Sequence, residues 1–314
     1  MKLSTLIAYR NHLDSLTPKD TKSLVLDATG PSLHMVETNL LKFDKLTEIL
    51  KQDSDNIQTA YDAYNLTINK IQQQVQHLID NIEPSYMVES YRLYEKEMID
   101  DSDEYILDRK IHLTTEAQEY LQDRIKLHGD WKYPGMIIRP GTESWIELLV
   151  GCDPLYLVDE NQNLLVPAMF KFNPAYRNRL RPYSVKERNT TNQMLKSIPD
   201  SQFAYCLVYN FFNYKPFEVL KSYFSEIYSK LRPGGTLAFT FNDCDRAGGV
   251  VLVERHFMCY TPGSLLLNLC KSLGYEVIQT YSIDTACTWV ELRKPGTLTS
   301  LRGGQSLAKI IANS

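Results

Sequence analysis

Residues 136–161 have the sequence MIIRPGTESWIELLVGCDPLYLVDEN, and this order of residue types predicts a strand, a tight turn, a helix and a second strand. We expect a buried strand at Met136–Ile138, a turn at Gly141, a helix at Ser144–Val150 and a strand at Leu155–Val158. A strand, a helix and a parallel strand in this order form the repeating unit of open α/β sheets. The stretch therefore predicts an α/β fold.

The turn after the first strand is where sheets of this kind bind nucleotides, at the N-terminus of the following helix. Here the turn holds a single glycine, Gly141, and Glu143 places a carboxylate where the pyrophosphate of a dinucleotide would lie. A carboxylate opposes a pyrophosphate, but it tolerates the ammonium and sulfonium groups of S-adenosylmethionine. These residues therefore favour S-adenosylmethionine over NAD as the cofactor.

Asp159 ends the second predicted strand, 18 residues after Gly141. In open α/β sheets, an acidic residue about 20 residues beyond the glycine turn binds the hydroxyls of a ribose. An aspartate at a strand end is also a common turn residue, but its spacing from the glycine favours the ribose role. We predict that the cofactor is bound by Arg139, Gly141, Glu143, Asp159 and Asn210.

The rest of the second half alternates between strand and helix patterns. We expect strands at Phe203–Tyr209, Thr236–Phe241, Glu276–Thr280 and Thr288–Leu292, helices at Phe217–Lys230 and Pro262–Leu273, and a turn at Leu231–Gly235. Together with the opening stretch, three sequence blocks resemble class I S-adenosylmethionine-dependent methyltransferases over about residues 130–296: SKLRPGGTLAFTF, YTPGSLLLNLCKSLGYEVI and WVELRKPG. The resemblance implies a doubly wound, Rossmann-like methyltransferase sheet and methyl transfer from S-adenosylmethionine to an unidentified acceptor.

The chain departs from the pattern of that family at several positions. The family usually has an acidic residue in the first strand, glycines in the first turn and an acidic residue after the third strand. This chain has Ile137 in the strand, Arg139 and Glu143 in the turn and, by rough alignment, the segment 189–192 after the third strand. We interpret the turn as a modified cofactor site, with a site that no longer supports catalysis as the alternative.

Catalytic residues are expected in the loops that follow the strands, because that edge of an α/β sheet binds the ligands. The candidates are Asn210, Asp243, Glu254 and His256, and the wider segment 242–260 is a candidate acceptor site. Each candidate has an ordinary alternative, which is a turn-forming or exposed polar residue. The Asn/Asp-Pro-Pro-Tyr/Phe motif of enzymes that methylate amino groups is absent, because Asn210 is followed by Phe-Phe-Asn-Tyr. This absence lowers the expectation of a DNA-adenine methyltransferase.

The first half of the chain, residues 1–130, has a helical pattern. Apolar residues alternate at spacings of four and three between Ile57 and Ile82, which is the heptad pattern of a coiled coil. We expect a helix over about residues 43–82, ended by Pro84, that joins copies of the chain into an oligomer, most simply a trimer. The alternative is a long helix packed inside its own chain. Further helices are expected at residues 1–16, as an amphipathic helix and not a signal peptide, and at 114–127.

Composition narrows the functional classes. The net charge of −4 and the pI of about 5.9 do not indicate a protein that binds nucleic acid or a membrane surface through bulk charge. No apolar run approaches the roughly 20 residues of a membrane-spanning helix, so we expect a cytoplasmic protein.

The six cysteines form no C-x-x-C pair and are expected to be free buried thiols, and the six histidines show no spacing typical of a metal site. The run 171–188 is basic and predicts an exposed helix face or, alternatively, a docking site for an anionic substrate.

A second functional class is an interaction protein. A heptad helix joined to a methyltransferase-like domain with an altered first turn is also what an oligomeric scaffold would contain. The blocks TFNDCD, FMCYTPG and SLRGGQSLAKI, the last of which lies in the C-terminal tail 297–314, resemble methyltransferase-like proteins of large tailed phages. That resemblance implies a structural or assembly role in a phage particle.

Overall fold

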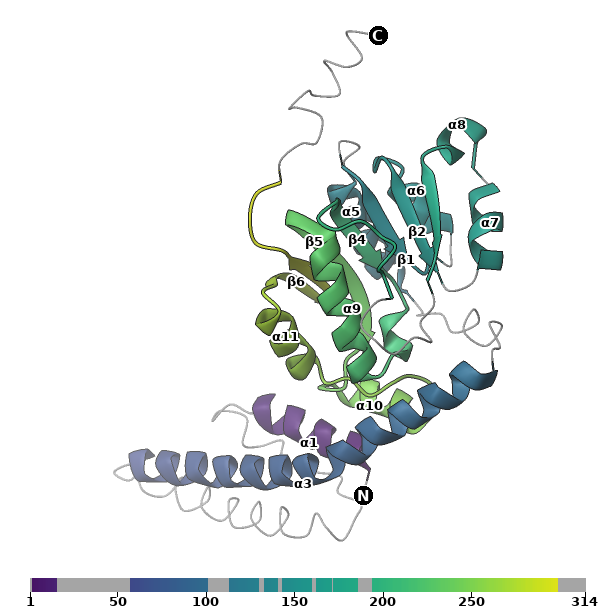
Figure 1. The fold of residues 1–314 in the computed structure, drawn as a ribbon. Helices are drawn as coiled ribbons and strands as arrows, with labels where there is room; N and C mark the ends of the chain where they lie inside the picture. Colours follow the sequence, from purple (N-terminus) through teal and green to yellow (C-terminus); the bar gives the residue numbers. More distant parts are fainter. Residues whose placement is uncertain are drawn as a thin grey trace.

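The computed structural model describes residues 2–15, 57–100, 113–129, 133–140, 143–159, 162–170, 172–185 and 194–298. Within these ranges a seven-stranded sheet has the strand order β3-β2-β1-β4-β5-β7-β6 (Figure 1). The strands are β1 (Gly135–Ile138), β2 (Leu155–Asp159), β3 (Leu180–Ser184), β4 (Phe203–Val208), β5 (Leu231–Asn242), β6 (Glu276–Ser282) and β7 (Cys287–Arg293). Strands β1 to β5 pair in parallel, whereas β7 is antiparallel to both β5 and β6. The chain therefore has the doubly wound, Rossmann-like sheet that its sequence predicts.

Helices cover both faces of the sheet. The helices of the described ranges are α1 (Leu3–Ser15), α3 (Ile57–Asp100), α5 (Thr115–His128), α6 (Glu143–Leu148), α7 (Gln162–Phe170), α8 (Pro174–Arg177), α9 (Phe217–Lys230), α10 (Ala247–Glu254) and α11 (Gly263–Ser272), with a 3₁₀ turn, η3 (Phe212–Tyr214). Helices α9 and α11 pack on one face of the sheet, and α5, α6 and α7 pack on the other (Figure 1). Helices α1, α3 and α10 lie together beyond the carboxyl end of β5 (Figure 1).

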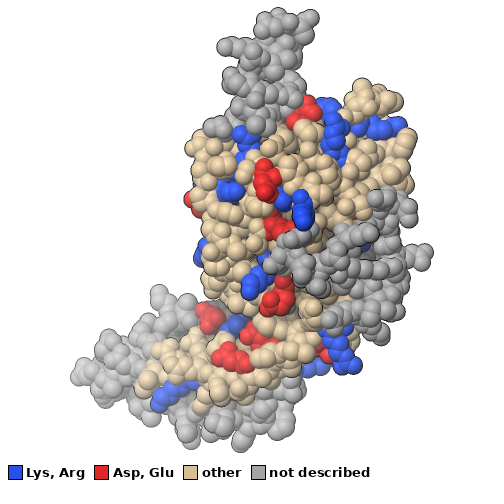
Figure 2. All heavy atoms as spheres, in the orientation of Figure 1, with Lys and Arg blue, Asp and Glu red and all other residues tan. Residues whose placement is uncertain are grey.

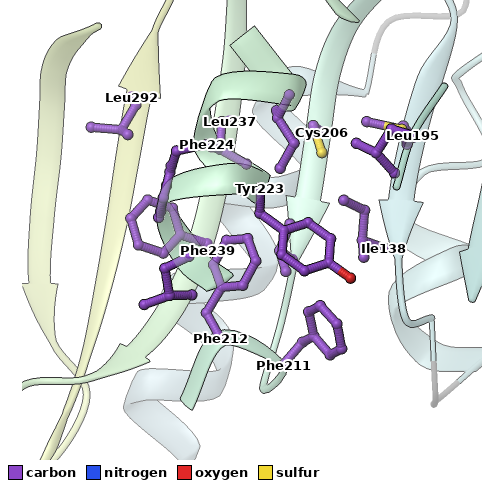
Figure 3. Close-up of a cluster of buried hydrophobic side chains, with 14 of the residues drawn as sticks. Ile138, Leu195, Cys206, Phe211, Phe212, Tyr223, Phe224, Leu237, Phe239 and Leu292 are labelled. Atoms are coloured by element: carbon purple, nitrogen blue, oxygen red, sulfur yellow. The ribbon is translucent and has the colours of Figure 1, made fainter. Parts of the chain in front are cut away.

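The two faces bury separate clusters of apolar side chains. Under α9 the cluster is aromatic, and the ring centre of Phe224 lies 5.1 Å from that of Phe212 and 5.0 Å from that of Phe239 (Figure 3). Every residue of β4 is buried, because this central strand is covered on both faces. The edge strand β6 instead alternates between exposed and half-buried residues, as an antiparallel edge strand with one covered face does.

Two details of the sheet differ from the sequence-based expectation. The segment Leu231–Gly235, predicted as a turn, forms the start of β5, and the pairing of β5 with β4 shifts register between Phe203 and Tyr205. Gly234 has a φ of 78° in this irregular part, a conformation that glycine adopts without steric cost. Strand β3 was not predicted, because Arg181 and Pro182 are exposed at the sheet edge and give no alternating apolar pattern.

The N-terminal amphipathic helix is confirmed as α1, but the end predicted for the heptad helix is wrong. Helix α3 runs for 44 residues and contains Pro84. Contacts beyond the proline account for this continuation: the hydroxyl of Tyr86 donates to Glu254, and the hydroxyl of Ser90 accepts from the backbone of Tyr260. In Figure 1 the helix changes direction part-way along its length, as helices with an internal proline often do.

The heptad residues of α3 that the structure describes are covered by the chain itself. Ile68, Ile71 and Val75 are buried in one cluster with apolar side chains of α1 and α10, while Leu78 and Ile82 pack against that cluster. This packing corresponds to the alternative in which the helix is buried inside its own chain. Residues 43–56 lie outside the described ranges, and the trimer through residues 43–82 stays a prediction.

Charged side chains of both signs are interspersed over the face shown in Figure 2. The basic run 171–188 does not form one exposed helix. Its described part contains α8 and β3, and the guanidinium groups of Arg177 and Arg181 donate to nearby backbone carbonyls. Arg179 lies 3.5 Å from Asp153. Over the ranges given above, no helix combines the length and hydrophobicity needed to cross a membrane.

Candidate functional site

The strand order places a topological switch point between β1 and β4. From β1 the chain moves outward to β2 and β3, and from β4 it moves outward in the opposite direction to β5. In open α/β sheets, ligands bind outside the carboxyl ends of the strands at such a point. In the register of the sheet, Ile138 pairs with Val158 and Ile137 with Leu207. The residues that follow these strands, at positions 139, 159 and 209–211, therefore meet at one edge.

Arg139 makes the turn that leaves β1. Its φ is 53°, in the left-handed region that favours glycine, and its backbone N–H donates to the carbonyl of Val158 at 2.6 Å. The turn thus keeps the backbone conformation that a glycine would adopt, but it carries a half-buried side chain. The guanidinium carbon lies 5.7 Å from the centre of the Phe211 ring.

Two other residues predicted for this turn are outside the part of the chain that can be described in detail. Gly141 lies outside the described ranges, and Glu143 is described only through its backbone, as the first residue of α6. The part of Gly141 and Glu143 in binding the cofactor therefore stays a prediction.

Asp159 is the last residue of β2, and its side chain is buried with 6% exposure. Its backbone carbonyl accepts a hydrogen bond from the N–H of Val185 at 3.0 Å, which joins the ends of β2 and β3. β2 is the neighbour of β1, so Asp159 lies one strand from Arg139. This is the place where an acidic residue binds a ribose in sheets of this type.

Asn210 follows β4 on the other side of the switch point and also has a positive φ, of 50°. Its backbone N–H donates to the Thr240 hydroxyl at 2.7 Å, and its side-chain oxygen accepts from Tyr214 and Asn213, each at 3.3 Å. Backbone conformations that cost energy persist where function requires them more often than elsewhere. Here two of them, at Arg139 and Asn210, flank the same switch point.

Aromatic side chains surround this edge. The Trp145 ring of α6 lies 4.6 Å from the ring of Tyr209, the first residue after β4. Burial raises the pKa of Tyr209 above its usual value, so its hydroxyl stays protonated at neutral pH. The sequence pattern did not identify these rings or Phe211 as site residues. The sequence could have pointed to Tyr209 and Phe211 only through their positions, because both residues closely follow the central strand β4.

Lys215 was also missed. It is buried, and its ammonium group lies 4.6 Å from the centre of the Phe211 ring and 5.0 Å from that of Tyr94 in α3. Helix α3 therefore reaches the carboxyl edge beside the switch point. Arg139 and Lys215 both lie against Phe211, so the edge carries two cationic side chains on one aromatic ring.

Asp243, predicted as catalytic, is part of the packing at the end of β5. Its carboxylate accepts from the Thr288 hydroxyl at 3.0 Å and from the backbone N–H of Asp245 at 3.1 Å. A side chain at Gly263 would collide with this carboxylate. Burial raises the pKa of Asp243, and the nearby Asp245 adds to the increase. The structure therefore places Asp243 between β7 and the start of α11, two strands from β1.

Glu254 and His256, the other predicted catalytic residues, are not at the switch point. The Glu254 carboxylate accepts from the backbone N–H of Ser4 at 3.1 Å, the Ser4 hydroxyl at 2.8 Å and the Tyr86 hydroxyl at 3.0 Å. It thus joins α10 to both N-terminal helices. His256 is exposed and has a φ of 55° in the turn after α10. Of the four candidates, the structure brings only Asn210 together with the predicted cofactor residues.

The segment 242–260, predicted as an acceptor site, packs mainly against the N-terminal helices. The side-chain amide of Asn242 donates to the carbonyls of Gly249 and Cys259, each at 3.1 Å, which fixes the segment to the end of β5. The hydroxyl of Tyr260 donates to Glu83 of α3 at 2.9 Å. The sequence could not show this role, because the partners are far away in the chain.

The residues at the switch point fit S-adenosylmethionine in two respects. Asp159 provides a buried carboxylate for ribose hydroxyls, and Arg139 keeps the left-handed turn that lets a backbone approach a ligand.

The six cysteines are free and buried. Among the described residues, no group of three or more histidine, cysteine or acidic side chains could hold a metal ion.

No family model matches the sequence, and no curated protein matches it. Similar solved structures include the N-methyltransferase NodS from Bradyrhizobium japonicum WM9 in complex with S-adenosyl-L-homocysteine, at 14% identity over 66% of this chain and 98% of that chain, with a TM-score of 0.44. An O-methyltransferase family protein from Burkholderia thailandensis is 10% identical over 58% of this chain and 57% of that chain, with a TM-score of 0.46. A SAM-dependent methyltransferase from Aquifex aeolicus is 11% identical over 65% and 98%, with a TM-score of 0.41. Similarities this low do not assign a reaction.

Proposed function

We propose that the domain formed by residues 133–298 binds S-adenosylmethionine at the switch point and transfers its methyl group to an acceptor. One observation carries this proposal: the buried Asp159 and the left-handed turn at Arg139 lie side by side where β2 and β1 end. The reversed final hairpin, in which β7 is antiparallel to β5 and β6, agrees with the sequence resemblance to class I methyltransferases.

Each residue at this edge has a distinct role in the proposal. Asp159 accepts hydrogen bonds from the ribose hydroxyls, and the turn at Arg139 lets the backbone lie against the nucleoside. When bound, S-adenosylmethionine supplies an electrophilic methyl group that an acceptor nucleophile takes as the carbon–sulfur bond breaks. Asn210 and the rings of Tyr209 and Phe211 position the acceptor, and positioning supplies much of the rate of such a transfer.

Calorimetric titration of the full chain with S-adenosylhomocysteine tests the cofactor part of the proposal. We expect binding by the wild type and a loss of at least about tenfold in affinity for Asp159→Asn, because a neutral amide accepts weaker hydrogen bonds than a carboxylate. Asp153→Asn is the matched control, since Asp153 precedes the same strand at its opposite end and pairs with Arg179. No heat from the wild type at millimolar ligand would contradict the proposal.

The catalytic part is tested with S-adenosylmethionine that carries a labelled methyl group. The protein is incubated with this cofactor and with candidate acceptors of different chemical classes. We expect the labelled methyl group to appear on acceptors of one class, and we expect this transfer to be lost when Asn210 is replaced. Retention of the label on the cofactor with every class, despite binding, would favour a domain that binds the nucleoside without turnover.

A scaffold is the second candidate function, and one observation favours it. Asp243 accepts a hydrogen bond from Thr288 of β7, and Glu254 accepts from Ser4 of α1 and Tyr86 of α3, so these two predicted catalytic residues hold parts of the chain together. In this alternative, a trimer formed through residues 43–82 would be a structural or assembly component of a phage particle, whereas the enzyme would act in the cytoplasm. Light scattering separates the two: a stable trimer without affinity for S-adenosylhomocysteine favours the scaffold.

A further inference from the structure

The segment that leads into β3 is strongly basic, although the chain as a whole is acidic. Between Glu160 and Glu187 the sequence has five basic residues and no acidic one, whereas the net charge of the chain is −4. The basic residues are Lys171, Arg177, Arg179, Arg181 and Lys186. The three arginines lie in the described ranges, in α8, directly before β3 and in β3. They therefore belong to the amino edge of the sheet, where the parallel strands begin.

Two of these arginines are held in place by backbone carbonyls. The guanidinium of Arg177 donates to the carbonyls of Phe170 at 3.1 Å and Phe172 at 3.0 Å. The guanidinium of Arg181 donates to the carbonyl of Asn178 at 2.6 Å. A carbonyl satisfies an N–H donor, but it has no net charge that would neutralise a guanidinium. Both positive charges are thus fixed in position before any anion binds, which lowers the entropic cost of binding.

Arg179 lies between them in the sequence but has different surroundings. Its Nε atom lies 3.5 Å from the carboxylate of Asp153, and its guanidinium carbon lies 5.5 Å from the centre of the Tyr176 ring. An arginine beside a carboxylate contributes less to the binding of an outside anion. Arg177 and Arg181 are therefore the two charges that carry the argument.

Phe170, the last residue of α7, adds an aromatic ring to this surface. It is 63% exposed, and the guanidinium carbon of Arg177 lies 4.3 Å from the centre of its ring. Val166, one helical turn earlier, is 49% exposed. A charged surface that only faces water has no need of an exposed phenylalanine, whose contact with water is unfavourable. The combination indicates a partner that carries both negative charge and flat apolar groups.

Nucleic acids have this combination of groups. Their phosphates bind the N–H fork of a guanidinium, and their bases stack on aromatic rings and on guanidinium planes. An acidic peptide would match the charges but would leave the ring of Phe170 without a role. Base faces are accessible in a single strand and are hidden inside a duplex, so the exposed ring favours a single strand.

We infer that Phe170, Arg177 and Arg181 form a binding surface for single-stranded nucleic acid, in which Phe170 stacks on a base and the two arginines bind phosphates. Figure 2 shows basic side chains at the corner of the molecule where Figure 1 places α8. This surface lies at the amino edge of the sheet, whereas the switch point lies at the carboxyl edge. The inference therefore goes beyond the proposed function and is independent of cofactor binding.

Fluorescence anisotropy of the full chain with a labelled single-stranded oligonucleotide of mixed sequence tests the two charges. The affinity should fall steeply with rising salt, because phosphate contacts release counterions. Arg181→Gln should weaken binding by about 3- to 10-fold and reduce the slope of log affinity against log salt by about 0.7. Arg92→Gln is the matched control, since Arg92 is an 80% exposed arginine of α3 that pairs with Glu89.

Substitutions of Phe170 test the stacking. Phe170→Leu keeps an apolar side chain but removes the flat ring, so it should weaken binding by about 5- to 100-fold, whereas Phe170→Tyr should bind as the wild type does. These variants remove little buried surface, because Phe170 is mostly exposed. Ile278→Ala is the control, since Ile278 is a 41% exposed residue of β6, at the other edge of the sheet, and should not affect binding.

Other outcomes overturn the inference. Absence of binding by the wild type at about 50 mM salt, where phosphate contacts are strong, would show that the surface does not bind nucleic acid. Equal affinity for a polyglutamate peptide, unchanged by Phe170→Leu, would indicate an acidic protein as the partner. Tighter binding of a duplex of the same sequence would exclude stacking on unpaired bases. A loss for Arg92→Gln as large as that for Arg181→Gln would place the binding elsewhere on the molecule.

Discussion

The carboxyl edge of the sheet has two halves that use polar residues in different ways. Around the ends of β2, β1 and β4, polar groups such as Arg139 and Asp159 lie at the topological switch point, which is the place where ligands bind in open α/β sheets. Around β5 and β7, Asp243 and Glu254 bind other parts of the same chain. The difference teaches that a polar residue near the carboxyl edge can instead hold distant elements of the chain together, so its position alone does not identify a ligand site.

The largest effect is expected in the half that serves packing. Glu291 in β7 is fully buried and accepts hydrogen bonds from Arg124 and His128 of α5 and from Trp289. Arg124→Met leaves this carboxylate without its strongest partner and should lower the free energy of unfolding by about 3–5 kcal/mol. Urea titration measures the loss, and the folded variant should keep the wild-type affinity for S-adenosylhomocysteine.

The matched control for this variant is Lys126→Met on the same helix. Lys126 is 54% exposed, and its pair with Asp123 is a surface pair, so its loss should stay within about 0.5 kcal/mol. Equal losses from the two variants would show that the buried network does not hold α5 on the sheet.

The same carboxylate predicts a dependence of stability on pH. Burial alone would raise the pKa of Glu291, but the hydrogen bonds from Arg124, His128 and Trp289 outweigh it and lower the pKa from about 4.5 to about 2. The stabilisation is therefore complete above about pH 4.5 and is lost as the pH falls toward about 2. The lost amount is about 3 kcal/mol, from the pKa difference.

Unfolding of the wild type and of Glu291→Gln at several pH values isolates this contribution. The difference between the two proteins should shrink as the pH falls from about 5 to about 2. A difference that does not change with pH would mean that the Glu291 pKa is the same in the folded and unfolded chains.

An intermediate effect is expected for the carboxylate that joins the N-terminal helices to α10. Glu254→Gln removes the charge that accepts from Ser4 and Tyr86 and should cost about 1–2 kcal/mol of unfolding free energy, without changing ligand affinity. Glu119→Gln is the control on an exposed position of α5. A loss of methyl transfer without a loss of stability would return Glu254 to the catalytic residues.

The smallest effect on stability is expected at the switch point. Arg139→Gly removes the strain of a left-handed arginine but adds the flexibility of glycine, so unfolding free energy should change by less than about 1 kcal/mol. Ser201→Gly is the control, because Ser201 has the same φ of 53° in a turn next to β4. A larger loss for Arg139→Gly alone would show that the guanidinium supports the fold and not a ligand.

Much of the sheet could be predicted from the sequence because buried strands such as β4 are continuous apolar runs bounded by turn residues. Helix α10 could not, because Gly248 and Gly249 are typical of a loop. In the structure neither position has space for a side chain. A Cβ atom at Gly248 would collide with the backbone of Thr285, and one at Gly249 would collide with the backbone of Asp243. Local residue preference and tertiary packing favour different conformations there, and packing prevails.

The candidate site was predictable where its signal is a spacing along the chain, as for Asp159. It was not predictable where the signal is a contact between distant segments. Glu254 meets Ser4, 250 residues earlier in the chain, and Lys215 meets Tyr94. A single sequence contains no such pairings, so a structural carboxylate was predicted as catalytic and a lysine at the switch point was overlooked.

The contact between α1 and α10 also has a consequence for synthesis of the protein. Translation makes α1 before α10, and the carboxylate that Ser4 of α1 binds follows 250 residues later in the chain. At about 5–20 residues per second, the ribosome needs at least roughly ten seconds to make the intervening chain. Throughout that interval, Leu3, Leu6 and Ile7, which are buried in the finished fold, lack the surface contributed by α10. The newly made α1 therefore exposes apolar side chains of the kind that chaperones bind.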